Sequence, residues 1–360
     1  MIATLIFILI LSLLIVVHEF GHFIVARKNG VRVEKFSLGF GKRIYSRKKG
    51  DTEYSLNLVP LGGYVKMAGD NLEECKGKSD EYFSKPPGKR FQIIVSGALL
   101  NYLLGFVFFW LIFCIGYPAL TTKIGGLVDG FGAQSAGLKA GDQIRTVEGR
   151  KVGNWNELQK EIQRNSSASS VNIMLLREGK ELEVAVPLKE KSAVDDLGQK
   201  RSLTLIGITP FDEIVEIRHG PLESIFLAGQ KTLDLTITTY KGLWFLATGR
   251  ISMRESMAGP LEIFFMTSRA ASLGLVAVLH LIAALSISLA IFNLLPVPVL
   301  DGGHVLLLGI EKVRGKPLGA GAERVLTNIG FSLLLTLVVL VTYNDILRRF
   351  GENIGKFIAK

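Results

Sequence analysis

The stretch IVVHEFGHFIVARK, residues 15–28, places two histidines and a glutamate at the end of an apolar run that begins at the start of the chain. Charged side chains are costly in such a setting, about 2.5–3.5 kcal/mol each at the centre of a membrane helix on insertion scales. His18, Glu19 and His22 therefore need a partner that offsets this cost. Positions i and i+4 share one face of a helix, so His18 and His22 can bind one metal ion while Glu19 addresses a water molecule on it.

A catalytic zinc ion takes three protein ligands and keeps one position open, so the HExxH pattern alone lacks one ligand. The segment NLLPVPVLDGGH, residues 293–304, supplies an acid directly after another apolar run. We expect Zn²⁺ to be held by His18, His22 and Asp301, with Glu19 as the catalytic base. A shared metal ion explains why ionisable groups occur in both apolar runs.

Each half of this site also has a simpler interpretation. An HExxH pattern can arise by chance in a chain of this length, and Asp301-Gly302-Gly303 alone is typical of a helix cap or a tight turn. The coincidence of both patterns at the same ends of their apolar runs favours the metal site. Of the other histidines, His304 is either a support for a ligand or a plain turn residue, and His280 is expected to be a hydrogen-bonded core residue.

Four apolar stretches are long enough to cross a bilayer, which takes about 20 residues. They cover residues 2–26, 91–118, 272–295 and 325–343 of a 360-residue chain that is 48% hydrophobic. The first stretch has no basic segment before it and no small-x-small cleavage site after it, so we expect a retained span rather than a signal peptide. The sequence predicts an α-helical polytopic membrane protein.

Lysine and arginine are unevenly distributed between the connecting segments. Residues 27–90 hold 15 of them against 8 acidic residues, residues 119–271 hold 19 against 18, and residues 305–324 hold 4 against 2. Because short cytoplasmic loops are enriched in Lys and Arg, we expect 27–90 and 305–324 in the cytoplasm and 119–271 outside. The net charge of +10 then indicates topology and contact with anionic lipid rather than nucleic-acid binding.

Between the first two spans, residues 33–70 alternate apolar and polar side chains in the manner of β-strands. Tyr54, Leu56 and Leu58 share one face, and a turn signal at 60–63 separates them from a second apolar run. The pattern predicts a β hairpin associated with the membrane from the cytoplasmic side. We expect the hairpin at 53–67 to offer an exposed strand edge that pairs with an extended substrate strand, and Tyr54, Leu56 and Leu58 are candidate substrate-binding residues.

The external segment contains SAGLKAGDQIRTVEGRKV, residues 135–152, which resembles PDZ domains of the bacterial protease type in its Gly-Leu-x-x-Gly-Asp turn before a strand. One such unit is expected, with a helix near Trp155–Arg164 and a hairpin turn at Arg177–Lys180. The only cysteines, Cys75 and Cys114, lie outside this segment and have no CxxC neighbour. This excludes a thiolate zinc site and a disulfide-held external domain.

The predicted fold class is thus a polytopic helical membrane protein with about four transmembrane helices, a membrane-associated β hairpin and an inserted extracytoplasmic PDZ (α+β) domain. We divide the chain into a first span with HEFGH (1–26), a cytoplasmic loop with the hairpin (27–90), a second span (91–118), a PDZ domain (119–200), an extracytoplasmic amphipathic region (201–271), a third span with the LDGG motif (272–304), a cytoplasmic loop (305–324), and a fourth span with the C-terminal tail (325–360).

Taken together, HEFGH, the PDZ unit and NLLPVPVLDGGH resemble the site-2 protease family of intramembrane zinc metalloproteases, in particular its bacterial RseP/RasP group. The resemblance implies that Gly62 and Gly63 lie in the family's membrane-embedded β loop and that Asn293 contacts substrate. Some relatives carry a second Asn five positions before Asn293, where this chain has Ser288, so Ser288 is also a candidate substrate-binding residue. Well-studied relatives carry two tandem PDZ units, where this chain shows one.

The same resemblance implies a multi-pass enzyme of the cell inner membrane with its active site toward the cytoplasm. Its reaction would be zinc-dependent hydrolysis within the transmembrane segments of single-span membrane proteins, of the anti-sigma-factor or signal-peptide-remnant type. The PDZ unit would contact a C-terminal peptide or an ectodomain. Two other classes stay open: a non-catalytic PDZ membrane scaffold that retains a metal site, and a transporter with an intramembrane acid.

Overall fold

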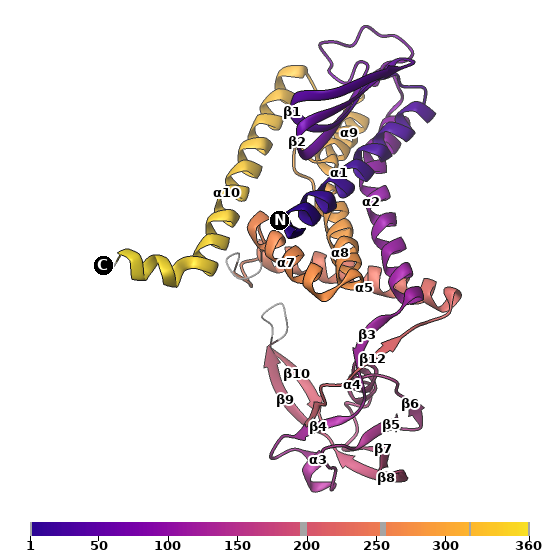
Figure 1. Cartoon of the computed structure of the whole chain (residues 1–360). Coiled ribbons are helices and arrows are strands. Elements are labelled where there is room, and N and C mark those ends of the chain that lie inside the picture. The colour runs from indigo at the N-terminus through magenta and orange to yellow at the C-terminus, as the bar shows by residue number, and fades with distance from the viewer. Residues whose placement is uncertain (1, 195–199, 253–256, 317, 359–360) are drawn as a thin grey trace. The chain divides into compact units, whose positions relative to one another are not determined.

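The computed structural model describes residues 2–194, 200–252, 257–316 and 318–358 (Figure 1). The chain forms two compact units. The first combines Met1–Ile112, Leu222–Trp244 and Ser252–Lys360, and the second combines Phe113–Pro221 and Phe245–Ile251.

Four helices of the first unit are long and apolar enough to cross a membrane, which confirms the prediction of four candidate spans. They are α1 (Ile2–Lys28), α2 (Pro87–Ile115), α8 (Leu275–Asn293) and the Gly321–Phe350 part of α10 (Ala320–Ile358), with mean hydropathies of 2.2–2.6. Three further helices belong mainly to this unit: α5 (Pro221–Ala247), α7 (Pro260–Leu273) and α9 (Asp301–Arg314).

Apolar side chains at the α1–α7–α8 contact form the core that fixes the first span. Ile10 and Leu14 of α1 are buried against Ala270 of α7 and against Leu281 and Ile282 of α8. All five side chains are less than a tenth exposed. The contact holds α1 on α8 within the first unit.

A buried carboxylate of α10 caps α7. Asp345 is 2% exposed, and its two oxygens accept hydrogen bonds from the backbone N–H groups of Gly259 and Glu262, at 3.2 and 3.1 Å. The first N–H groups of a helix lack partners within the helix, so an acid at this place satisfies them and interacts favourably with the helix dipole. Asp345 therefore ties the last span to α7.

The loop after α1 folds into a sheet that is more complex than the predicted hairpin. Strands β1 (Val33–Lys49) and β2 (Thr52–Met67) both bend, so that each contributes two extended segments. Segment 33–38 pairs with 63–67 on one side and with 53–56 on the other. Segment 53–56 pairs in turn with 45–48, which makes 43–49 and 63–67 the two edges.

This pairing shows which part of the predicted hairpin at 53–67 has a free edge. Tyr54 pairs with both Phe36 and Arg47, and Leu56 pairs with both Leu38 and Tyr45, so neither is at an edge. Within the predicted hairpin at 53–67, the free edge is therefore segment 63–67. The physical reason is the bend in each strand, which brings a second segment of β1 alongside β2.

Buried polar groups fix the bend. Asn57 is 7% exposed and donates to the Ser37 hydroxyl at 2.8 Å and to the Gly39 carbonyl at 2.9 Å. Ser55 donates to the same Ser37 hydroxyl at 3.0 Å. Gly39 has φ of +79°, and an added Cβ there would meet the backbone oxygens of β2, so only glycine fits this close approach.

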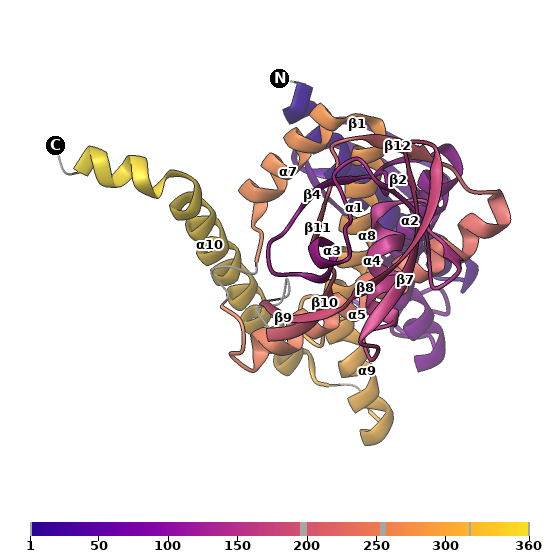
Figure 2. The same cartoon turned by 90° about the horizontal axis from the view of Figure 1, so that it is seen from below.

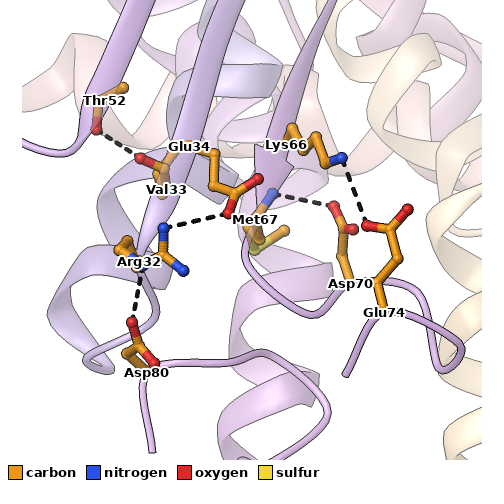
Figure 3. Close-up of polar contacts among 9 residues, drawn as sticks. All are labelled: Arg32, Val33, Glu34, Thr52, Lys66, Met67, Asp70, Glu74 and Asp80. Carbon is orange, nitrogen blue, oxygen red and sulfur yellow. Dashed lines mark hydrogen bonds and ion pairs between the residues drawn. The ribbon is translucent and has the colours of Figure 1, made fainter. Parts of the chain in front are cut away.

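Ion pairs and a backbone hydrogen bond hold the base of the sheet to the loop that follows it (Figure 3). Arg32 donates to Asp80 at 2.8 Å, and Lys66 lies 3.5 Å from Glu74. The N–H of Met67 donates to Asp70 at 2.9 Å. The pairs are exposed and contribute little individually, but together they fix where the edge segment 63–67 ends.

The second unit contains a sheet in the order β6-β5-β7-β8. Its helix α4 (Trp155–Arg164) buries Trp155, Leu158 and Ile162 in the core of this unit. The helix confirms the element predicted at these residues. Strands β7 and β8 lie side by side (Figure 2) and meet in the predicted turn at Arg177–Lys180. The strands of this sheet are β5 (Gln143–Val147), β6 (Arg150–Lys151), β7 (Ser170–Arg177) and β8 (Lys180–Pro187).

Shorter strands complete the second unit in antiparallel pairs. Strand β3 pairs with β12 from Tyr117–Ile217 to Leu120–Ile214, so the two ends of this long insertion lie next to each other. Strands β3 and β12 are Tyr117–Leu120 and Ile214–Ile217. Strand β4 (Ile124–Leu127) pairs with β11 (Ile208–Pro210), and β9 (Lys189–Val194) pairs with β10 (Lys200–Leu205). The remaining element is the short helix α3 (Gly132–Ser135).

An ion pair links the Gly-Asp turn of this unit to the end of β7. Asp142 is 1% exposed and accepts from Nε and Nη2 of Arg177, both at 2.7 Å, and from the backbone N–H of Lys139 at 2.8 Å. Burial opposes ionisation of Asp142, but these hydrogen bonds outweigh it and hold the pKa of the carboxyl below its ordinary value of 3.8.

Candidate metal centre

Helix α1 brings the two imidazoles of the HExxH pattern together. Their Nε2 atoms are 3.2 Å apart, and the rings meet edge to face. The spacing follows from the helix, because residues four apart are stacked on one face. Both Nε2 atoms therefore lie close enough to bind the same ion.

Asp301 completes the cluster from the first residue of α9. Its Oδ2 lies 3.4 Å from Nε2 of His18 and 3.5 Å from Nε2 of His22. This oxygen is buried and accepts no hydrogen bond from the residues that the structure describes. The predicted ligand set is thus brought together at one place in the first unit.

The three donor atoms fit a zinc ion. Tetrahedral zinc with ligands about 2.0–2.2 Å away separates those ligands by about 3.3–3.6 Å. The observed separations of 3.2, 3.4 and 3.5 Å agree with this spacing. Two imidazoles and one carboxylate also leave a fourth position open, as catalytic zinc sites do. The buried Oδ2 of Asp301 gains a partner when a cation is bound.

Further hydrogen bonds orient both imidazoles. Nδ1 of His22 donates to the carbonyl of Ile93 in α2 at 2.8 Å, which leaves the Nε2 lone pair of His22 free for the metal. The side-chain amide of Asn293, the last residue of α8, lies 3.4 Å from Nδ1 of His18. The first three long apolar helices thus all contribute to the centre.

The backbone before Asp301 is strained. Val299 has φ of +136°, which is rare for a β-branched residue and costs on the order of 1–3 kcal/mol. Gly302 and Gly303 follow, and an added Cβ at either would meet the backbone of the loop between α8 and α9. These tight contacts limit where α9 can begin, and Asp301 is its first residue.

Two small residues that sequence reasoning missed allow α1 and α2 to approach each other at the centre. An added Cβ on Gly97 would collide with Nε2 of His22 and lie 2.8 Å from Cε1 of His18. An added Cβ on Gly21 would collide with the Ser96 carbonyl. The run of Ser, Gly and Ala at 96–98 inside an apolar span was the available signal, because small residues mark close helix contacts in membranes.

Glu19 faces a cavity of about 310 Å³ next to the ligands. Its walls include His22 and Asp301 and the edge residues Val65 and Met67 of β2. Gly63 of the same edge lies close to Glu19, since a Cβ added to it would be 3.3 Å from Cγ of Glu19. A carboxylate, two candidate metal ligands and a strand edge therefore share one cavity.

For the other predicted substrate-binding residues, the structure gives surroundings but no contact with Glu19 or the two imidazoles. Tyr54 packs among Phe23 and Phe36 in a small core, whereas Leu56 and Leu58 are 42% and 61% exposed. Gly62 packs against the Phe40 ring, and Ser288 is half-buried on α8. The structure brings Gly63 and Asn293 to the centre and leaves the roles of the other residues as predictions.

The remaining histidines differ in their surroundings. His304 lines the cavity beside Asp301. His280 was expected to be a core residue, but it is exposed on α8, where it meets the Phe109 ring edge to face at 5.3 Å between centroids. Sequence reasoning also missed Arg90 and Glu311, which line the same cavity.

Comparison with known proteins matches the model of peptidase family M50 to residues 6–337. The regulator of sigma-W protease RasP of Bacillus subtilis is 29% identical and is aligned over 96% of this chain and 98% of its own length. Zinc metalloprotease RasP of Bacillus licheniformis has the same identity and coverage. Protease RseP of Yersinia pestis is 31% identical over 95% of this chain and 98% of its own length.

Among solved structures, the PDZ domain of an SdrC-like protein from Listeria monocytogenes covers 26% of this chain and 87% of its own length. The identity is 23% and the TM-score is 0.20. A likeness at this score carries no argument about the fold. The PDZ domain at 119–200 and its extracytoplasmic position therefore stay predictions.

Proposed function

The chain belongs to peptidase family M50, the site-2 protease family of intramembrane zinc proteases, and on this basis we propose that His18, His22 and Asp301 bind the catalytic Zn²⁺ and that Glu19 is the general base. The observation that carries the proposal is the triangle of ligand atoms with sides of 3.2–3.5 Å. The alternative of a non-catalytic scaffold has no support in the comparisons.

The proposed reaction is hydrolysis of a peptide bond by water. A zinc ion held by His18, His22 and Asp301 would lower the pKa of water to near 7 and polarise the scissile carbonyl. Glu19, which faces the cavity beside these residues, would take a proton from the water as its oxygen bonds to the carbonyl carbon, and would pass it to the amine that leaves when the C–N bond breaks.

We propose two tasks for Asn293. With its amide turned so that Oδ1 accepts from the Nδ1–H of His18, the Nε2 lone pair of His18 is free for the metal. The amide NH₂ group then remains to donate to a carbonyl of the substrate backbone or to the developing oxyanion. Ser288 would support substrate from the same helix.

We propose that the edge segment 63–67 of β2 binds the extended substrate. Among the described strands, only β1 pairs with this segment, so its other side is free. Its residues Gly63 and Val65 lie beside Glu19. A transmembrane substrate arrives as a helix whose scissile bond is shielded by its own hydrogen bonds. Pairing with a free edge supplies replacement hydrogen bonds for the unwound chain.

Other predicted residues would contribute side-chain contacts. Leu56 and Leu58 are exposed apolar groups on the sheet and would contact apolar substrate side chains. Gly62 would allow the bend beside the Phe40 ring, and Tyr54 would support the sheet from its core.

We further propose the cellular setting. The substrates are single-span membrane proteins of the anti-sigma-factor or signal-peptide-remnant type, in line with the Bacillus subtilis relative, which is a regulator of sigma-W protease. The charge distribution supports a protein of the inner membrane, with 27–90 and the metal centre toward the cytoplasm and a PDZ domain at 119–200 outside. This domain would contact a C-terminal peptide or an ectodomain.

A Glu19→Gln variant tests the catalytic assignment. Purified full-length wild type is expected to contain zinc and to cleave members of a panel of single-span proteins, whereas Glu19→Gln keeps the zinc and loses cleavage. Unchanged cleavage in the variant would refute the role of Glu19. Wild-type protein purified without chelators and free of metal would refute the zinc site.

A proline at Val65 tests the edge. It is expected to abolish cleavage while zinc content stays normal, because proline in an edge segment removes a hydrogen-bond donor and distorts pairing. Ser46→Pro, on the opposite edge, is the matched control and should retain cleavage. Equal cleavage by both variants would contradict the proposed binding edge.

A further inference from the structure

The cavity beside the metal centre has a second group of charged residues that the proposed reaction does not use. Arg90, in the first turn of α2, is 4% exposed, and its Nη1 and Nη2 donate to the two carboxylate oxygens of Glu311 near the end of α9. Nε of Arg90 donates to the carbonyl of Lys85 at 3.1 Å, and its guanidinium lies over the Phe83 ring. Each of the three guanidinium nitrogens thus donates a hydrogen bond, and the group also lies over an aromatic ring.

This pair is unusual in its burial. The Arg90 and Glu311 side chains are 5% and 14% exposed, whereas the Arg324–Glu73 pair is 65% and 53% exposed. Removing two charges from water is costly and is offset only by good geometry and additional hydrogen bonds. A two-point guanidinium–carboxylate contact also fixes the relative orientation of the two helices, because both groups are planar.

Helix α9 has few other anchors. Its buried residues are Gly302, Gly303 and Leu308, and the side chains of Leu306 and Val313 are 48% and 88% exposed. The glycines hold only its first turn, since their contacts are with the preceding loop. Glu311 lies ten residues beyond Asp301, about 15 Å along the helix. The pair with Arg90 is therefore the charged anchor of the far end of α9.

The same two helices meet again at the metal centre. Helix α2 presents the carbonyl of Ile93, which orients His22, one turn beyond Arg90. Helix α9 presents Asp301. Helices α2 and α9 are therefore linked twice. One link is the direct pair of Arg90 with Glu311, and the other runs from Asp301 of α9 through His22 to the Ile93 carbonyl of α2. Because the helix is stiff, a tilt of the far end of α9 would also tilt its first turn and change the direction of the Asp301 carboxylate.

We propose that Arg90 and Glu311 are positioning residues, which hold α9 so that Asp301 presents its oxygen to the metal. The inference rests on the proposed zinc site. It assigns to the pair no contact with substrate or metal. Groups that orient metal ligands from outside typically change metal affinity by about 10–100-fold when they are altered.

The test measures zinc affinity of the full-length protein in detergent against buffered free zinc. Glu311→Gln keeps the shape of the side chain and removes its charge, and its zinc dissociation constant is expected to rise at least about tenfold. Glu73→Gln, which breaks the exposed pair with Arg324, is the matched control and should bind zinc as the wild type does. Equal affinity of Glu311→Gln and wild type would overturn the proposal.

A double variant separates positioning from simple stability. Arg90→Met/Glu311→Leu leaves no buried charge unpaired, and such apolar replacements often restore stability. Its thermal unfolding should return to that of the wild type, while its zinc affinity stays low and its cobalt-substituted form shows an altered ligand-field spectrum. If zinc affinity and spectrum return together with stability, the pair serves packing alone and the proposal is wrong.

The two proposals fail in different ways. If wild-type protein binds no zinc, the proposed zinc site is wrong. If the wild type binds zinc and all variants of the pair bind it equally well, only the positioning role is wrong.

Discussion

Gly97 provides a quantitative test of how tightly α1 and α2 meet at the metal centre. In a Gly97→Ala variant the new Cβ would lie 2.8 Å from Cε1 of His18 and would collide with Nε2 of His22. Carbon atoms in contact prefer about 3.5–4.0 Å, so the overlap with His18 alone is about 0.7–1.2 Å. The obstacle is a ring held by its own contacts, and relief requires α1 or α2 to shift.

The expected size of the effect follows from the cost of overpacking. Added methyl groups in a packed site cost about 1–3 kcal/mol. If this strain is relieved by displacement of the imidazoles, the zinc dissociation constant should rise about 5- to 150-fold, at about 1.4 kcal/mol for each factor of ten. Cleavage of a single-span reporter at limiting free zinc should fall in parallel.

The assay compares purified full-length variants in detergent by zinc titration and by cleavage. Gly88→Ala is the matched control, because it lies on the same helix and an added Cβ there meets no atom within 4 Å. It should bind zinc normally and unfold at the same or a slightly higher temperature. Wild-type zinc affinity and cleavage in Gly97→Ala would refute the steric reasoning.

Three further predictions concern other parts of the chain. Asp142→Asn should destabilise the second unit by about 2–3 kcal/mol at pH 7, because charged hydrogen bonds with Arg177 are lost. The depressed pKa of Asp142 contributes stability above its ordinary value of 3.8 and loses it as pH falls through the folded-state pKa, so urea unfolding should show wild type and variant converging at acid pH. Asp345→Ala should leave the start of α7 uncapped and increase protease sensitivity around residues 257–260, whereas unchanged proteolysis would contradict the cap. Asn57→Ala should cost about 1–3 kcal/mol by leaving buried partners in the bent sheet unsatisfied, measured as a lower unfolding temperature; an unchanged temperature would argue against that network.

The spans and the clustering of His18, His22 and Asp301 were predictable from sequence because their signals are local or chemically rare. A run of apolar residues specifies a span by itself, and an acid next to such a run is unusual enough to be paired with the HExxH pattern. Asp301 and the two histidines were therefore matched across almost the whole chain without any contact information.

The bend of the sheet could not be read from sequence. Alternation shows which side chains share a face, but it does not show how often a strand doubles back. The bend depends on Asn57, Ser55 and Ser37, which are polar residues buried inside the sheet. A pattern of exposed polar and buried apolar positions assigns such residues to the wrong side.

The close helix contact and the charged anchor were missed for a related reason. Gly21 and Gly97 allow a close approach only because they face each other across two helices. Arg90 is more than two hundred residues from Glu311 in the sequence. A single sequence, read without an alignment, gives no signal that such residues are neighbours. Small residues within a span indicate that some contact is close, but they do not name the partner.

The antiparallel pairing of β3 with β12 has a consequence for how this chain can be edited. Because Leu120 pairs with Ile214 and Tyr117 with Ile217, the polypeptide enters and leaves the long insertion at neighbouring positions. Such a cassette can be exchanged for a short turn, or for a foreign module whose termini are equally close, with little demand on the connecting segments. Modules can thus be acquired, lost or duplicated at this junction without rebuilding the helices that carry the proposed metal ligands.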